Sequence, residues 1–203
     1  MAYRPTAKTK ARKAEVRQRV LDAAFALVGV GGFGALSMQA VATGAGIATG
    51  AVYLHFPSKA ELCAEVFRIA TEREVAVVRN AAQAAGTFAQ RLEQAVRVFA
   101  ERVLRPQRTA YALIAEPVDP VVDVERLRYR QAYALVFEQL VREGVDNGSF
   151  AAQDATVSAA ALVGVIAEAL TGPLSTQTPA GAEGNLVIAA IQAFCLRAVG
   201  AAA

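Results

Sequence analysis

Residues 42–59 read ATGAGIATGAVYLHFPSK, and this stretch decides the fold that the sequence predicts. Gly44 and Gly46 stand where one short helix has to stop and the next has to start, because glycine allows a positive φ or a close approach between helices. Residues 37–54 therefore read as a helix, a tight turn and a second helix. This is the helix-turn-helix arrangement, whose second helix enters the major groove of DNA.

The segments around this stretch complete a small helical unit. Apolar residues recur at helical spacing over residues 16–28, and the glycines of GVGGFG, residues 29–34, are expected to end that helix. Ser37 is the expected N-cap of the next helix. Ser58 and Glu61 have the spacing of a capping box, which predicts that a fourth helix begins there.

The rest of the chain is also expected to be helical, because alanine and arginine favour helix and no strand pattern interrupts them. The expected helices cover about 58–85, 87–104, 107–115, 122–145, 154–170 and 179–199. Residues 172–181, GPLSTQTPAG, are expected to form a loop. The predicted fold class is therefore all-α, with about nine helices.

Charge is unevenly spread along the chain. The first 60 residues hold eight of the 21 Lys and Arg but two of the 18 Asp and Glu, so they carry +6 and the remainder carries −3. A basic end on a mildly acidic body is typical of a protein that meets nucleic acid at one end, although a solvated basic tail would have the same composition. With 55% hydrophobic residues, the body can bury a core.

The sequence lacks the residues that several classes of function require. Cys63 and Cys195 are isolated, so no zinc site is predicted and no cofactor is expected. One histidine, with no nucleophile motif, phosphate-binding loop or dinucleotide fingerprint, argues against an enzyme. We find neither a secretory signal nor a clean apolar span, so a cytoplasmic protein with no membrane partner is expected.

Residues 20–67, VLDAAFALVGVGGFGALSMQAVATGAGIATGAVYLHFPSKAELCAEVF, resemble the TetR family of bacterial transcriptional regulators. The resemblance rests on both glycines of the turn, on Tyr53 and Phe56, and on Lys59, all at the family's spacing. Beyond this segment the chain matches only as architecture. The resemblance implies three parts: a basic flexible arm (1–12), a helix-turn-helix DNA-binding domain (13–57) and a helical ligand-binding and dimerisation domain (58–203).

The resemblance also implies roles for single residues. Those at base-reading positions are Gln39, Thr49, Gly50 and Ala51. Those at phosphate positions are Tyr53, His55 and Lys59, and Ser37 is a helix cap that could also contact phosphate. Ala48 departs from the family, which often has Ser or another capping residue there. Since few hydrogen bonds are available from residues 49–51, specificity is expected to depend on DNA shape and on the basic arm. Taken alone, His55 and Tyr53 could be packing residues.

A ligand site in the C-terminal part is predicted on weaker grounds. Aromatic residues at helical spacing usually form a core, but helices this rich in alanine can leave an apolar cavity. The candidate lining residues are Phe99, Tyr111, Glu116, Arg128, Tyr129, Tyr133, Phe137, Ile166 and Glu168. For the charged candidates, surface positions or ordinary ion pairs are the alternative.

The resemblance implies a repressor, and with it we predict that the protein binds a palindromic operator as a homodimer and is released by a small, largely apolar effector. The last two expected helices are apolar on most sides, so they are predicted to pair with the same helices of a second copy. A constitutive or architectural DNA-binding protein without an effector is the alternative, and activation instead of repression stays open.

Overall fold

The structure is a computed structural model that describes residues 6–104, 112, 113, 116, 118–176 and 182–201, with backbone alone for 171–176 and 182. Within this part of the chain there are eight α-helices, one 3₁₀ helix and no strand, which confirms the all-α class. The elements are α1 (Ala7–Gly31), η1 (Phe33–Ala35), α2 (Met38–Ala45), α3 (Thr49–Tyr53), α4 (Lys59–Ala82), α5 (Phe88–Val103), α7 (Pro120–Asp146), α8 (Ala155–Thr176) and α9 (Ala182–Ala198). Of the helix expected at 107–115, only Ala112 and Leu113 are described, and both are helical.

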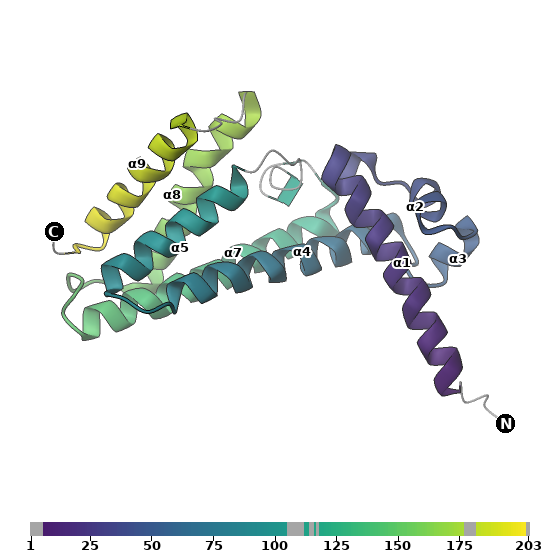
Figure 1. Ribbon diagram of the computed structural model, residues 1–203, viewed down its shortest axis with the longest axis horizontal. Coiled ribbons are helices and arrows are strands. Elements are labelled where there is room, and N and C mark those ends of the chain that lie inside the picture. Colours follow the sequence, from purple (N-terminus) through teal and green to yellow (C-terminus); the bar gives the residue numbers. More distant parts are fainter. Residues whose placement is uncertain (1–5, 105–111, 114–115, 117, 177–181, 202–203) are drawn as a thin grey trace.

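Two long helices join the two ends of the molecule. Figure 1 shows α4 and α7 running side by side, with α1, α2 and α3 at one end and α5, α8 and α9 at the other. α7 also packs against α8, and α5 packs against both α4 and α9. We call α5, α7, α8 and α9, with the part of α4 that they cover, the body. α4 begins directly after the helix-turn-helix, so it connects that unit to the body.

The helix-turn-helix unit has its own apolar core. α1 buries Val20, Leu21, Ala24 and Val28 on one face, at the spacing that the sequence predicts. The inward-facing valines of the other two helices, Val41 in α2 and Val52 in α3, have 0% exposure. One buried residue, Val52, therefore suffices to anchor the short α3 in the core, because α1 and α2 supply the rest of that core.

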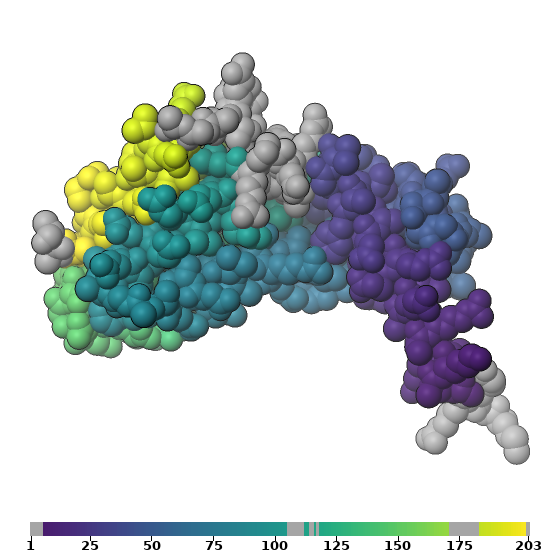
Figure 2. All heavy atoms as spheres, in the orientation of Figure 1, coloured from purple at the N-terminus to yellow at the C-terminus, as the bar shows by residue number. Residues whose placement is uncertain are grey.

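The first helix begins earlier than predicted. The side chain of Thr6 accepts a hydrogen bond from the backbone N–H of Thr9, and this N-cap starts α1 at Ala7 instead of Lys13. Residues 7–12 of the predicted flexible arm are therefore helical. Figures 1 and 2 show this end of α1 projecting beyond the rest of the molecule.

The end of α8 is a second correction. The helix runs to Thr176 and not to about Leu170, so Gly172 and Pro173 lie within it and not in a loop. Proline removes one backbone donor, but its fixed φ is helical, and a helix that packs against neighbours can continue through it. The rest of the expected loop, residues 177–181, lies outside the described residues.

Aromatic rings form a connected series from η1 into the body. Phe33 lies 6.0 Å from Phe67 between ring centroids, and Phe67 lies 6.1 Å from Tyr129. Tyr129 is 4.5 Å from Tyr133, which stacks on Phe99 at 4.3 Å. Because these residues come from η1, α4, α7 and α5, the series packs one end of the molecule against the other.

Among the described residues, no helix combines the length and the apolar character that crossing a bilayer requires.

Candidate nucleic-acid interface

Two glycines shape the turn between α2 and α3, in the two ways that the sequence predicts. Gly46 has φ 64°, a left-handed conformation, and it caps α2. Gly44 has no such φ, but a Cβ atom there would lie 3.1 Å from the Cβ of Ala23 in α1. One glycine therefore allows the turn and the other allows α1 and α2 to approach closely.

An arginine that sequence reasoning missed holds the same turn. Arg19 of α1 donates from Nε to the carbonyl of Ala45 at 3.1 Å and from Nη2 to the carbonyl of Gly46 at 3.2 Å. These carbonyls lie at the C-terminal end of α2, where a cation is favoured by the helix dipole. Arg19 counts toward the basic end of the chain, but its guanidinium is engaged in the turn.

The predicted base-reading residues come from α2 and α3 and differ in their exposure. Gln39 and Gly50 are exposed, whereas Thr49 and Ala51 are half-buried. A Cβ atom added at Gly50 would meet nothing within 4 Å, and Ala48 provides no side-chain cap. The outer face of α3 is therefore small and open, which lets another molecule approach its backbone.

The predicted phosphate-binding residues lie at or next to the ends of helices. Tyr53 is 49% exposed at the end of α3, and Lys59 is exposed in the first turn of α4. The Oγ atoms of Ser37 and Ser58 accept hydrogen bonds from the N–H groups of Ala40 and Glu61, both at 3.1 Å, which confirms them as N-caps. The second half of the predicted box, from the Glu61 side chain, is not formed among the described hydrogen bonds.

His55 is half-buried at the end of α3, and its Nδ1 atom is buried without a hydrogen-bond partner. Burial, together with the positive charges of Lys13 and Arg17, lowers the pKa of its imidazole. The ring is therefore neutral at pH 7. A buried N–H without a partner is unfavourable, so we assign the proton to Nε2, which makes Nε2–H the donor of this side chain.

An ion pair joins α1 to α4 and is shared with a second arginine of α4. Arg17 forms a salt bridge with Glu65, which also pairs with Arg68 at 2.9 Å. The hydrogen bond from Arg68, supported by that from Arg17, lowers the pKa of Glu65 to about 2. The Arg17 guanidinium lies 4.9 Å above the ring of Phe56. Like Arg19, Arg17 holds the domain together.

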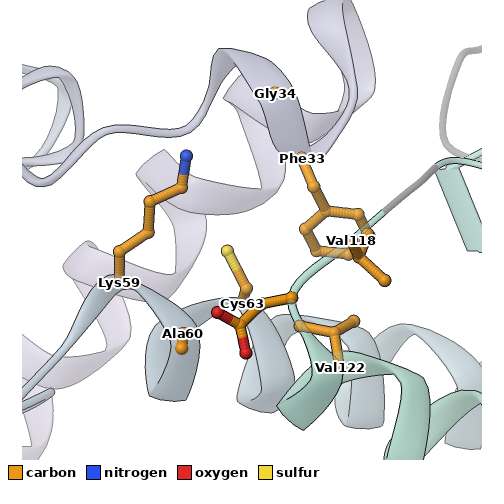
Figure 3. Close-up of a pocket in the computed structure, with 8 residues that line it drawn as sticks. Phe33, Gly34, Lys59, Ala60, Cys63, Val118 and Val122 are labelled. Atoms are coloured by element: carbon orange, nitrogen blue, oxygen red, sulfur yellow. The ribbon is translucent and has the colours of Figure 1, made fainter.

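Lys59 also lines a cavity of about 470 Å³ between η1, the start of α4 and the start of α7. Figure 3 shows side chains from all three elements around it. The other lining residues are Phe33, Gly34, Ala60, Cys63, Val118, Asp119 and Val122. Burial raises the pKa of the Cys63 thiol to about 11, so this thiol is protonated and unreactive at pH 7.

The candidate ligand residues separate into two groups. Those that lie in the core of the body are Phe99, Tyr129, Tyr133, Phe137 and Ile166, each at most 9% exposed. The hydroxyl of Tyr129 donates to that of Tyr133 at 2.8 Å, and burial raises the pKa of both phenols.

The other candidates lie elsewhere. Glu168 is exposed on α8, and Arg128 is exposed on α7 and paired with Glu125. Arg128 and Tyr129 contribute to a groove of about 370 Å³ between α4 and α7. The carboxylate of Glu116 accepts hydrogen bonds from η1, and Tyr111 lies outside the described residues. The ligand role of the whole set stays a prediction.

Two parts of the chain match known families. Residues 20–66 match the bacterial regulatory proteins of the tetR family, and residues 85–171 match the tetracyclin repressor-like C-terminal domain. The chain is 44% identical over 78 residues to the HTH-type transcriptional repressor KstR of Mycolicibacterium smegmatis, and 50% identical over 48 residues to that of Rhodococcus jostii. These alignments cover 38% and 24% of this chain and 38% and 23% of those relatives, so the chain matches less than half of their length.

Solved structures share the fold over nearly the whole chain. The fatty acid degradation regulator FadR of Bacillus halodurans has a TM-score of 0.75 at 18% identity, over 89% of this chain and 94% of that one. FadR of Bacillus subtilis in complex with stearoyl-CoA has a TM-score of 0.76 at 14% identity, over 90% and 98%. At these identities the likeness concerns the fold alone. With both family matches in chain order and the turn built as described, the protein belongs to the TetR family of bacterial transcriptional regulators.

Proposed function

We propose that the protein is a transcriptional repressor that binds a palindromic operator as a homodimer and is released by a small, largely apolar effector. The observation that carries the DNA-binding part is the open outer face of α3, flanked by exposed Tyr53 and Lys59. The curated relatives from two genera are both HTH-type transcriptional repressors, which favours repression over activation.

On DNA, α3 would lie in the major groove. Its first turn, Thr49 to Ala51, carries small side chains, so the backbone can come close to the base edges. The Thr49 hydroxyl and Ala51 methyl would make the direct contacts, with Gln39 from α2 beside them. The Tyr53 hydroxyl, the Lys59 ammonium and the Nε2–H of His55 would donate to phosphate oxygens on either side.

The exposed start of α1 would add phosphate contacts. Lys8, Lys10, Arg12 and Lys13 are all exposed, and they follow one another over less than two turns of helix. Each contact of such a residue with phosphate makes the affinity for DNA more dependent on salt. The exposed cations therefore favour a contribution to the binding free energy that does not depend on the base sequence.

A second copy is proposed to pack on α8 and α9. Both helices keep large apolar side chains on the surface, with Val157 65%, Leu186 72% and Phe194 46% exposed. A two-fold pair built on these helices would bury such side chains and repeat the recognition helix at a fixed distance. That distance would match a palindrome, whose half-sites lie one helical turn of DNA or a multiple of it apart.

The effector is proposed to bind in the body and to act through α4. α4 packs against α5 and α7 and begins at Lys59, so a ligand that separates these helices would move the DNA-binding end. The solved structure of B. subtilis FadR with stearoyl-CoA, which has the same fold, supports an effector with a long apolar part.

The first test is selection of bound sequences from a random pool of double-stranded DNA. Wild type should enrich a palindrome. Tyr53→Ala/Lys59→Ala should lose that enrichment because it removes two proposed phosphate contacts. The variant should still fold, since both side chains are exposed and neither supports the core. Arg97→Ala/Glu101→Ala, which removes an exposed ion pair on α5, is the matched control and should keep it. No enrichment by folded wild-type protein would contradict the proposal.

A thermal-shift screen tests the effector. Stearoyl-CoA, or a long-chain fatty acid, should raise the melting temperature and release the selected operator. An operator complex that no apolar or amphipathic compound releases would favour the alternative, a constitutive or architectural DNA-binding protein.

A further inference from the structure

We infer that Glu116 is a positioning residue for DNA binding, through which the body holds the helix-turn-helix unit in one orientation. The part that concerns DNA rests on the proposed function. The contact itself does not, since it can be measured in the free protein.

The carboxylate of Glu116 caps η1. One oxygen accepts the N–H of Phe33 at 3.0 Å and the other accepts that of Gly34 at 2.9 Å. The first N–H groups of a helix have no partner within the helix, and a charged acceptor forms the stronger kind of hydrogen bond with them. Glu116 follows these residues by more than 80 positions, so the cap comes from the segment before α7 and not from the residues that flank η1.

The chain leaves room for this carboxylate. Gly32 has φ 71°, and a Cβ atom at that position would lie 2.4 Å from one oxygen of Glu116. Any other residue would meet both a strained backbone and the carboxylate. The glycine before η1 therefore forms one wall of the site that receives Glu116.

Arg126 fastens the segment that bears Glu116 to α7. Its Nη2 donates to the backbone carbonyl of Glu116 at 2.7 Å, and its Nε donates to that of Leu113 at 3.2 Å. Its side chain pairs with Asp123 at 2.7 Å. The position of the carboxylate is therefore set by one of the two long helices of the body.

Several attachments together fix an orientation where the covalent link through α4 alone would leave a hinge. The Arg17–Glu65 ion pair and the ring contact of Phe33 with Phe67 tie the helix-turn-helix unit to α4, and the hydrogen bonds that Glu116 accepts from η1 add an attachment to the segment before α7. In a dimer, the attachment through Glu116 would help to set the distance between the two recognition helices. Removing Glu116 would let that distance vary without changing the surface that reads DNA.

The first arm of the experiment is amide hydrogen exchange in the free protein. Glu116→Ala should raise the exchange rates of the Phe33 and Gly34 N–H groups by roughly tenfold or more, since it removes their acceptor. Glu116→Gln keeps one neutral acceptor, the amide oxygen, and should retain part of the protection that Glu116→Ala loses. Glu101→Ala, on the exposed surface of α5, should leave both rates unchanged. Unchanged rates in Glu116→Ala would overturn the inference.

The second arm measures binding to the selected operator and to versions with one base pair added or removed between the half-sites. Glu116→Ala should bind the original spacing roughly tenfold more weakly and should lose most of its preference over the altered spacings. The slope of log Kd against log salt should stay the same, because Glu116 contacts no phosphate. A folded variant with the wild-type preference for spacing would overturn the positioning role.

Gly32→Ala supplies a double-mutant cycle. Alone it should loosen the preference for spacing as Glu116→Ala does, because its methyl group displaces the carboxylate. Combined with Glu116→Ala it should add little further change, since the two substitutions break one contact. Fully additive effects would contradict the inference. If wild type binds no DNA, the proposed function and the DNA role both fail, while the exchange rates still report whether the contact forms.

Discussion

The helix-turn-helix end and the body are stabilised by different kinds of contact. At the helix-turn-helix end, Ser37 caps α2 at its start and Gly46 ends it, both by bonds that reach four residues or fewer. In the body, Tyr133 of α7 stacks on Phe99 of α5, and Tyr129 of α7 packs edge-on against Phe67 of α4. The ends of α2 are therefore shaped largely by local caps, whereas the body depends on packing between helices that are distant in the sequence. Substitutions in the two regions should differ in size accordingly.

Tyr133→Ala should be the most severe change, because it removes a fully packed ring and leaves the Tyr129 hydroxyl without its acceptor. We expect a loss of about 3–5 kcal/mol in the free energy of unfolding, measured by urea denaturation. Tyr133→Phe keeps the ring and should lose about 1–2 kcal/mol. A loss below about 1 kcal/mol for the alanine variant would mean that this aromatic series does not stabilise the body.

Gly46→Ala should have an intermediate effect, since its cost is confined to one residue with a left-handed backbone. The expected loss is about 1–2 kcal/mol in the free energy of unfolding. The same variant should also bind DNA more weakly, because the turn sets the angle between α2 and α3. Wild-type stability would show that the turn can adopt another conformation.

Glu65→Gln tests the ion pairs that link the two regions. The pKa of Glu65 in the folded protein is about 2, below its ordinary value of 4.5, so its contribution to stability is present above pH 4.5 and is lost as the pH falls toward 2. Since Arg17 and Arg68 are partly exposed, we expect a loss of about 1 kcal/mol at pH 7. Urea titrations should show that the difference in the free energy of unfolding between this variant and wild type narrows between pH 4.5 and 3. Glu101→Gln, whose ion pair is exposed, should show almost no gap.

Gly50→Ala should have the smallest effect on stability and the opposite sign. The position is helical and an added methyl meets nothing within 4 Å, so a gain of about 0.5 kcal/mol is expected. DNA affinity should fall nonetheless, because the methyl occupies the face proposed to approach the bases. Equal losses of stability and of binding would argue that this face belongs to the core.

The same contrast explains what the sequence could predict. The caps at Ser37 and Ser58 were predictable because each side chain accepts from an N–H three residues ahead, and the glycines of the turn indicate a positive φ or a close approach of helices. The class of fold followed from such local signals. The short α3 followed from the glycines of the turn, and the candidate role of Tyr53 followed from the family's spacing.

Contacts between distant residues were not accessible in this way. Arg19 reaches a carbonyl 26 residues away, and the carboxylate of Glu116 reaches amides more than 80 residues away. The residues around Arg19 and Glu116 do not indicate these distant partners. From the sequence, Arg19 counted only as part of the basic end of the chain, and Glu116 was a candidate ligand contact. The early start of α1 was also missed, although Thr6 and Thr9 have the spacing of a cap.

The start of α1 has a consequence for how far the protein can reach. Residues 6–15 are exposed, and the first turn holds no acidic side chain to balance the cations near the positive end of the helix. Such a segment opens locally with little free energy. As a helix, Ala7–Lys13 spans about 10 Å, but as an extended strand the same residues span about 23 Å. If residues 7–13 unwind, the segment becomes flexible and more than twice as long. Its lysines could then follow a DNA backbone whose path differs from one site to another.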